Sequence, residues 1–169
     1  MSGEKDDEYI RVLIADDDQQ ILDAYCEAFT ESEPTQEVRA LDALAAELFD
    51  PGDVGEQEPK FDVVACSQGD DAITLAKEAA NDGEPFDVVI LDVRMPPGID
   101  GVEAGSEIRK LDPDVEIVFV TGYSDVPLEE LQRRVPPPMK LHYFSKPLSF
   151  TRLAQRVATM VGTGQARGL

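Results

Sequence analysis

The sequence has no tryptophan, one histidine and only two cysteines. Cys26 and Cys66 are far apart and lie in apolar patterns, so we expect two buried free thiols rather than a disulfide or metal ligands. His142 has no second histidine or cysteine nearby in the sequence, which indicates a partly exposed strand residue rather than a ligand or catalytic base. A zinc site is therefore not expected.

Positive charge is also scarce. The chain has 15 lysines and arginines against 35 aspartates and glutamates, for a formal net charge of −20. Nucleic acid and anionic lipid bind clustered cations, so we expect neither direct nucleic-acid binding nor membrane binding. The acidity is compatible with a salty cellular environment or with a role in solubility, and the sequence leaves both open.

Long apolar runs are missing as well. No run approaches the roughly 20 residues that a membrane-spanning helix needs, and the first nine residues do not resemble a signal peptide. A cytoplasmic protein is expected. With 169 residues and 42% hydrophobic residues, the chain is expected to form one domain over 1–162, followed by a flexible tail over 163–169.

Short apolar runs recur and alternate with helical patterns. The runs are YIRVLIA (9–15), FDVVACS (61–67), FDVVIL (86–91), EIVFVT (116–121) and LHYFS (141–145). The central ones are almost continuous in Val, Ile and Phe, which is typical of parallel strands buried on both faces. The predicted helices cover 18–31, 69–81, 100–111 and 124–134, and a last one begins at Ser149. This alternation predicts an α/β fold with a five-stranded parallel sheet flanked by helices.

Residues 33–60 interrupt the alternation. We expect an extra amphipathic helix over 36–49 and an acidic loop over 50–60. Ligands of open parallel sheets bind beyond the carboxyl ends of the strands. The connection from the first helix to the second strand lies at the other edge, so the insertion should be far from such a site.

Polar residues follow the predicted strands at that carboxyl edge. Asp16, Asp17 and Asp18 follow the first strand, Asp92 the third, Thr121 ends the fourth, and Ser145 and Lys146 end the fifth. Two carboxylates about 4 Å apart repel by about 4 kcal/mol at an effective dielectric of about 20, so a cation is expected among them. Mg²⁺ is the natural candidate because it prefers oxygen ligands, and Lys146 adds a second positive charge. A metal, a lysine and a hydroxyl around one carboxylate suit phosphoryl transfer to an aspartate.

Four segments carry a resemblance to a known family. VLIADDD (12–18), ILDVRMPPGIDG (90–101), VTGYSD (120–125) and FSKPLS (144–149) together resemble the receiver domain of two-component response regulators. The match covers nearly the whole chain apart from the insertion. It implies a flavodoxin-like fold with strand order 2-1-3-4-5, here with an extra inserted helix.

The resemblance also implies roles for individual residues. Asp92 resembles the phosphoacceptor, and Asp16 and Asp17 resemble the acidic pair that binds Mg²⁺ or Mn²⁺, with Asp17 as the direct ligand. Asp92 and the backbone carbonyl of Arg94 would complete the protein ligands. Asp18 is expected to cap the first helix instead.

A second group of residues resembles the family's switch. Thr121 matches the switch hydroxyl, Lys146 the lysine that contacts the phosphoryl group, and Tyr143 the switch aromatic. The implied partner is a sensor histidine kinase or a phosphotransfer protein. The surface formed by the fourth predicted helix, the fifth strand and the last helix is expected to bind a partner or a second copy of the chain.

Three functions fit the motifs. The first is a phosphoacceptor receiver, which catalyses its own phosphorylation and dephosphorylation and is not otherwise an enzyme. The second is a pseudo-receiver that binds partners without phosphorylation. The third is an aspartyl-phosphate phosphatase, which typically has a second aspartate two residues after the nucleophile. Arg94 occupies that position, so the phosphatase is disfavoured.

Overall fold

The computed structural model describes residues 9–30, 60–122 and 126–163. Its centre is one parallel sheet with the strand order β2-β1-β3-β4-β5. The strands are β1 (Tyr9–Ala15), β2 (Lys60–Cys66), β3 (Val88–Asp92), β4 (Glu116–Thr121) and β5 (Leu141–Ser145). The predicted fold class and strand order are confirmed.

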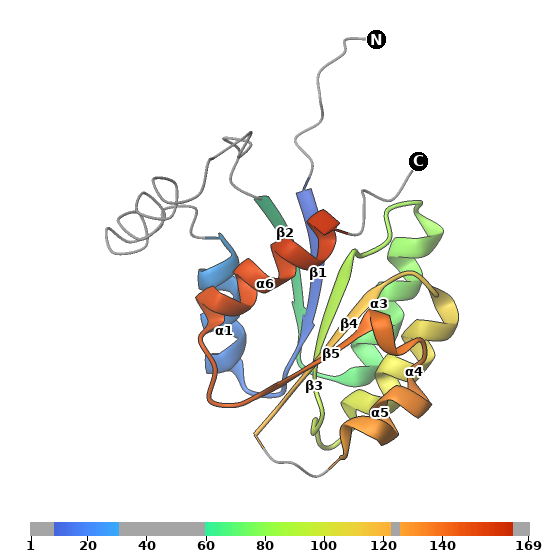
Figure 1. Cartoon of the computed structure of the whole chain (residues 1–169). Helices are drawn as coiled ribbons and strands as arrows, with labels where there is room; N and C mark the ends of the chain where they lie inside the picture. Colours follow the sequence, from blue (N-terminus) through green and yellow to red (C-terminus); the bar gives the residue numbers. More distant parts are fainter. Residues whose placement is uncertain (1–8, 31–59, 123–125, 164–169) are drawn as a thin grey trace, which may run out of the picture.

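Helices cover both faces of the sheet (Figure 1). They are α1 (Gln19–Thr30), α3 (Gly69–Asn81), α4 (Gly101–Leu111), α5 (Leu128–Arg134), α6 (Phe150–Thr163) and the short 3₁₀ helix η1 (Pro138–Lys140). α1 and α6 lie against one face, and α3, α4 and α5 lie against the other. The sheet is therefore buried on both sides, as its continuous apolar strands require.

The central strand shows why the strand runs are so apolar. All five residues of β3 are buried. Because side chains alternate along a strand, Val88 and Ile90 join the core beneath α1 and α6. Val89 and Leu91 join the core on the opposite face, together with residues of α3, α4 and α5. Both faces of the strand need apolar side chains, so the sequence of β3 does not alternate between apolar and polar residues.

Two helices begin at the residues where the sequence predicts them to start, and side chains cap both. The Asp100 carboxylate accepts a hydrogen bond from the Glu103 backbone N–H at 2.8 Å, at the start of α4. The Ser149 hydroxyl accepts one from the Arg152 N–H at 3.3 Å, at the start of α6. These side chains satisfy N–H groups that have no partner within the helix.

The helix predicted over 124–134 begins later than expected. α5 starts at Leu128, and Pro127 takes the N-cap position. A proline disfavours the helical conformation at the residue before it, so Val126 stays outside the helix. Residues 123–125 lie outside the described part of the chain.

The predicted insertion falls almost entirely outside the described residues, which resume at Lys60. The described residues on either side of it are close together. The Phe29 ring, near the end of α1, packs edge to face on Phe61 with ring centroids 4.8 Å apart. Lys60 pairs with Tyr9 at the beginning of the sheet. The connection therefore leaves and returns at the edge where the strands begin.

Both cysteines are free thiols, as predicted, but the expectation of full burial is wrong. Cys26 and Cys66 are half-buried. Cys66 lies on β2, one of the two edge strands of the sheet, and edge strands are covered less completely than central ones. Burial still raises the pKa of the Cys66 thiol, to about 11.

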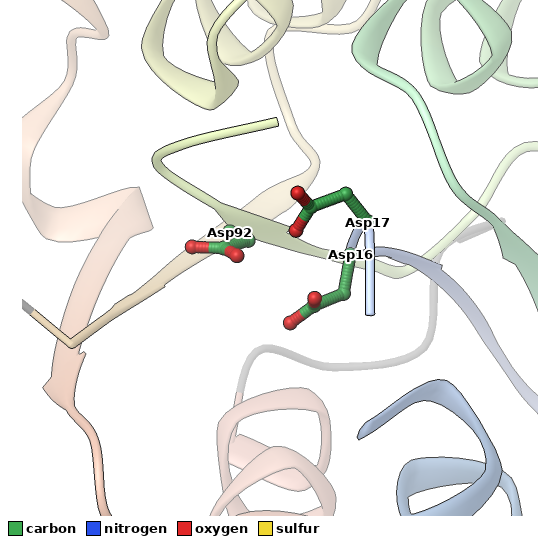
Figure 2. A group of neighbouring side chains, drawn as sticks. All are labelled: Asp16, Asp17 and Asp92. Atoms are coloured by element: carbon green, nitrogen blue, oxygen red, sulfur yellow. The ribbon is translucent and has the colours of Figure 1, made fainter. Parts of the chain in front are cut away.

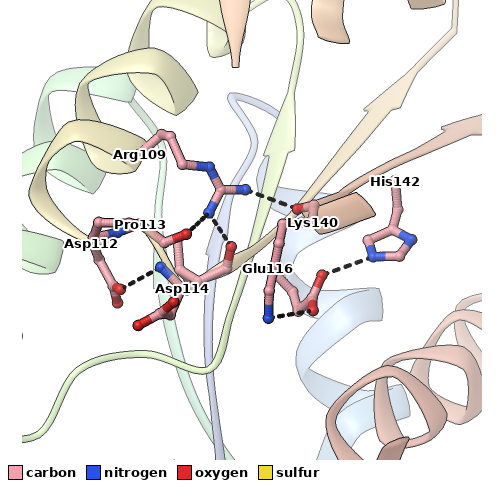
Figure 3. Close-up of polar contacts among 8 residues, drawn as sticks. Arg109, Asp112, Pro113, Asp114, Glu116, Lys140 and His142 are labelled. Atoms are coloured by element: carbon pink, nitrogen blue, oxygen red, sulfur yellow. Dashed lines mark hydrogen bonds and ion pairs between the residues drawn. The ribbon is translucent and has the colours of Figure 1, made fainter. Parts of the chain in front are cut away.

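An arginine joins three segments at the edge where the strands begin (Figure 3). Arg109, near the end of α4, is 6% exposed. Its guanidinium donates hydrogen bonds to the carbonyls of Pro113 at 3.2 Å, of Lys140 at 2.8 Å and of Val115. One side chain thus ties the end of α4 to the start of β4 and to η1.

His142 lies near the same edge, half-buried on β5. Its Nε2 is 2.9 Å from a carboxylate oxygen of Glu116, whose other oxygen is 3.3 Å from the Lys140 ammonium (Figure 3). Burial alone would raise the pKa of Glu116, but the His142 hydrogen bond and the Lys140 charge outweigh it and lower the pKa. His142 is thus a partly exposed strand residue, as predicted.

Candidate functional site

The register of the sheet brings two carboxylates together. Ala15 of β1 pairs with Leu91 of β3. The next residues along these strands are Asp16 and Asp92, so neighbouring strands end on carboxylates at the same edge. A strand is a rigid support, and this edge is where ligands bind in open parallel sheets.

Asp17 completes a cluster of three. Carboxylate oxygens of Asp16, Asp17 and Asp92 all lie within 4.8 Å of one another, and Figure 2 shows the groups facing a common space. Asp16 is 1% exposed and Asp92 9%, whereas Asp17 is exposed. The site is therefore acidic, partly desolvated and open on one side.

Lys146 bridges the two buried carboxylates. Its ammonium is 3.0 Å from Asp16 Oδ2 and 3.4 Å from Asp92 Oδ2. Its backbone N–H donates to the Thr121 carbonyl at 2.7 Å, which places the lysine just beyond β4 and β5. Burial by itself lowers the pKa of Lys146, but Asp16 and Asp92 outweigh burial and raise it. The ammonium is a permanent positive charge beside Asp92.

The acidity of Asp92 reflects its surroundings. Burial is the largest influence and the charge of Asp16 the next, and together they raise the pKa of the Asp92 carboxyl to about 6. Lys146 and the Arg94 backbone N–H, 3.4 Å from Asp92 Oδ1, oppose this rise. A carboxylate that is poorly solvated and repelled by its neighbours is favoured to bind a cation or to react as a nucleophile.

Asp18 stands apart from the cluster. Its carboxylate accepts a hydrogen bond from the Gln20 N–H at 2.9 Å, at the start of α1, as predicted for a cap. Its own N–H donates to Asp16 Oδ1 at 2.9 Å and so helps to orient that carboxylate.

The three remaining residues singled out in the sequence lie on or near these strand ends. Thr121 is 3% exposed and pairs with Ser145 at the end of β4. Tyr143 is half-buried on β5, packed against the core beneath α3, α4 and α5. Arg94 lies in the loop that follows Asp92, and its side chain is exposed.

Two further residues, to which the sequence analysis gave no role, shape the loop between β3 and α4. A Cβ on Gly101 would lie 1.9 Å from the Asp92 carbonyl oxygen, so only glycine allows this approach. The Gln68 amide contacts the same loop at Pro96 and Gly98. The only sequence signal for Gln68 is that it follows the second strand, at the same edge as the carboxylates.

Comparison with known proteins identifies the family. The model of the response regulator receiver domain matches residues 54–158. The chain belongs to the response regulator receiver family. The receiver is the domain of two-component systems that the four strand-end motifs resemble.

Curated relatives of this receiver include whole signalling proteins. The Sensor kinase CckA of Brucella abortus (strain 2308) is 31% identical over 105 residues, which are 62% of this chain and 10% of that protein. The Response regulator receiver protein CpdR of the same organism is 31% identical over 78 residues, 46% of this chain and 62% of that protein. The chain thus spans only part of the length of these relatives.

Solved structures show the same fold. A response regulator receiver domain protein (CheY-like) from Methanospirillum hungatei JF-1 superposes with a TM-score of 0.63 at 18% identity, covering 95% of this chain and all of that one. A response regulator receiver protein from Sinorhizobium medicae WSM419 gives a TM-score of 0.61 at 23% identity, covering 94% of this chain and 98% of that one.

Among the described residues, none of the helices has the length and apolar character needed to cross a bilayer.

Proposed function

We propose that this receiver accepts a phosphoryl group on Asp92 from a sensor histidine kinase or a phosphotransfer protein. The observation that carries the proposal is the set of charged groups around Asp92. It ends a buried strand, its oxygens lie within 4.8 Å of those of Asp16 and Asp17, and Lys146 contacts it at 3.4 Å. Family membership makes phosphoryl transfer the chemistry to test there.

Asp92 acts as the nucleophile. One of its carboxylate oxygens forms a bond to phosphorus while the bond between phosphorus and the donor nitrogen breaks, and the electron pair of that bond stays on the nitrogen. The rigid strand holds the carboxylate in one place, which lowers the entropic cost of attack. Lys146 contributes a positive charge to the oxygens of the transferred group. The protein thus acts on itself and turns over no other substrate.

The donor set fits Mg²⁺ or Mn²⁺. Three carboxylates converge within 4.8 Å at an open edge, and hard divalent cations prefer carboxylate, carbonyl and water oxygens. Asp16, Asp17, Asp92 and the Arg94 carbonyl would hold the ion. When bound, it neutralises charge on the phosphoryl oxygens. It would also relieve the repulsion that raises the Asp92 pKa.

Phosphorylation then shifts the receiver between two states. Thr121 lies at the end of the strand next to Asp92, where its hydroxyl can hydrogen-bond to the phosphoryl group. Thr121 moves toward the phosphoryl group. Tyr143, two residues before the end of β5, then fills the space that Thr121 leaves. The surface of α5, β5 and α6 changes shape and binds a partner or a second copy of the chain.

The proposed setting is the cytoplasm, with no direct contact with membrane or nucleic acid, because the net charge of −20 repels both. Relatives named as transcriptional regulatory proteins include ZraR of Salmonella typhimurium, 33% identical over 97 residues that are 20% of its length. An output of that kind would reside outside the receiver.

Labelling with a small phosphodonor tests the proposal. The wild type, incubated with acetyl phosphate and Mg²⁺, should acquire one phosphoryl group by intact mass, and Asp92→Asn should acquire none. Asp23→Asn removes an exposed carboxylate of α1 and should label like the wild type. Phosphate release over many turnovers with no accumulation of label would indicate a phosphatase, and neither label nor phosphate release would indicate a pseudo-receiver. Undiminished labelling of Asp92→Asn would exclude Asp92 as the acceptor.

A further inference from the structure

The loop between β3 and α4, residues 93–100, carries Arg94 and is held at its base. The Gly101 N–H donates to the Val93 carbonyl at 2.8 Å, which closes the loop. The Met95 side chain is 1% exposed and anchored in the core. These contacts hold the beginning and end of the loop, but not its tip at Pro96 and Gly98, which are exposed.

One side chain from another segment holds the tip. The Gln68 amide nitrogen donates to the Pro96 carbonyl at 3.3 Å, and its amide oxygen accepts from the Gly98 N–H at 3.1 Å. Both ends of the amide are used, so the two contacts together define its orientation. Gln68 spans 28 and 30 residues of sequence in making these contacts.

The position of Gln68 in the fold supports a role beyond its own helix. It is the N-cap residue of α3, yet its side chain makes no capping hydrogen bond. The usual capping residues are Ser, Thr, Asp and Asn, and the longer glutamine side chain reaches the loop instead. The next residue, Gly69, also accommodates the loop, since a Cβ there would lie 2.9 Å from Ile99 Cγ1. The junction of β2 and α3 is thus shaped around the loop that follows Asp92.

We propose that Gln68 is a positioning residue for the metal site. Its amide holds the tip of the loop, and Arg94 lies between that tip and the base at Val93. The Arg94 carbonyl is thereby kept in place beside Asp92, so Gln68 sets the affinity for Mg²⁺ and the metal concentration at which Asp92 reacts. The inference rests on the proposed function and names a further residue on which it depends.

Two substitutions release the tip from opposite sides. Gln68→Met keeps the length of the side chain and removes both hydrogen bonds. Gly98→Ala leaves Gln68 in place but puts a Cβ 2.7 Å from its amide oxygen, which displaces the end of that flexible side chain. Gln155→Met, on the exposed face of α6, is the matched control.

The first measurement is Mg²⁺ affinity, followed by NMR shifts without phosphodonor. Loss of hydrogen bonds worth about 1 kcal/mol should raise the Kd by about threefold to tenfold in Gln68→Met and in Gly98→Ala. The Gly98 amide should exchange its hydrogen faster in Gln68→Met. The phosphorylation rate at low Mg²⁺ should fall in the same proportion and recover at saturating Mg²⁺. A purely structural role would lower the rate at every metal concentration.

The outcomes separate this inference from the proposed function. A wild type that binds Mg²⁺ but is never labelled removes the proposed function and leaves the role of Gln68 standing if its variants bind Mg²⁺ more weakly. If the wild type is labelled on Asp92 but Gln68→Met and Gly98→Ala have Mg²⁺ Kd values within twofold of the wild-type value, the inference about Gln68 is overturned and the proposed function stands. A wild type that binds no Mg²⁺ overturns the inference as well. If Gln68→Met does not fold, Gly98→Ala decides.

Discussion

Replacing Asp92 with asparagine should stabilise the metal-free protein at neutral pH, although it removes the proposed phosphoacceptor. The carboxylate is 9% exposed, and burial and Asp16 raise its pKa from 3.8 to about 6. The folded protein therefore holds the Asp92 proton more tightly than the unfolded chain does. The stability that this proton confers is present below the unfolded pKa and is lost as the pH rises through the folded pKa.

The size of the effect follows from the pKa difference. A rise from 3.8 to about 6 corresponds to about 3 kcal/mol of lost stability above pH 7, at 1.36 kcal/mol per pKa unit. Asparagine keeps the shape of the side chain without the charge and so avoids this loss. For a domain of this size each kcal/mol moves the Tm by about 2–4 °C, so Asp92→Asn should melt about 6–12 °C higher.

Thermal unfolding followed by circular dichroism in EDTA measures this difference. The advantage of Asp92→Asn should be full at pH 7.5 and fall to about half at pH 5, where the wild-type carboxyl is protonated in the folded state. Asp23→Asn removes an exposed charge and should leave the Tm within about 2 °C of the wild type. Equal stability of Asp92→Asn and wild type at pH 7.5, or an advantage that does not change with pH, would refute the reasoning.

Three further predictions concern residues outside the carboxylate cluster. Arg109→Met should lower the free energy of unfolding in urea by about 2–4 kcal/mol, because several carbonyls lose a charged donor. Lys110→Met, at the exposed neighbouring residue, is the control, and an equal loss of stability in both variants would contradict the role of Arg109. Gly101→Ala should lower the free energy of unfolding by about 1–3 kcal/mol in the same assay, despite the higher helix propensity of alanine, because its Cβ clashes with the Asp92 carbonyl. A stabilised variant would show that the loop moves aside without cost. Cys66, with a pKa of about 11, should react with a thiol reagent at pH 8 far more slowly in the folded protein than in urea, and equal rates would show that its burial does not protect it.

The sequence alone determined the alternation of strands and helices and the edge of the sheet at which the site lies. Strands buried on both faces form continuous apolar runs, and the flanking helices show a different period, so β3 and its neighbours could be predicted directly. The carboxyl ends of parallel strands all lie at one edge of the sheet. Because Asp16 and Asp92 each follow a predicted strand, the sequence is enough to place both at that edge. The helix starts at Asp100 and Ser149 depend on side chains that act within a few residues, and they were predictable for that reason.

Other features depend on contacts between distant segments, and only the tertiary structure decided them. Lys146 lies 3.0 Å from Asp16 although 130 residues separate them in the sequence. The pKa of Asp92 depends on how completely the helices and loops cover it, which no local pattern records. Gln68 has no motif of its own, because its role comes from the crossover that brings the end of β2 beside the loop after β3. Propensity and periodicity describe each segment separately, whereas such distances arise only when the sheet register and the helix packing are satisfied together.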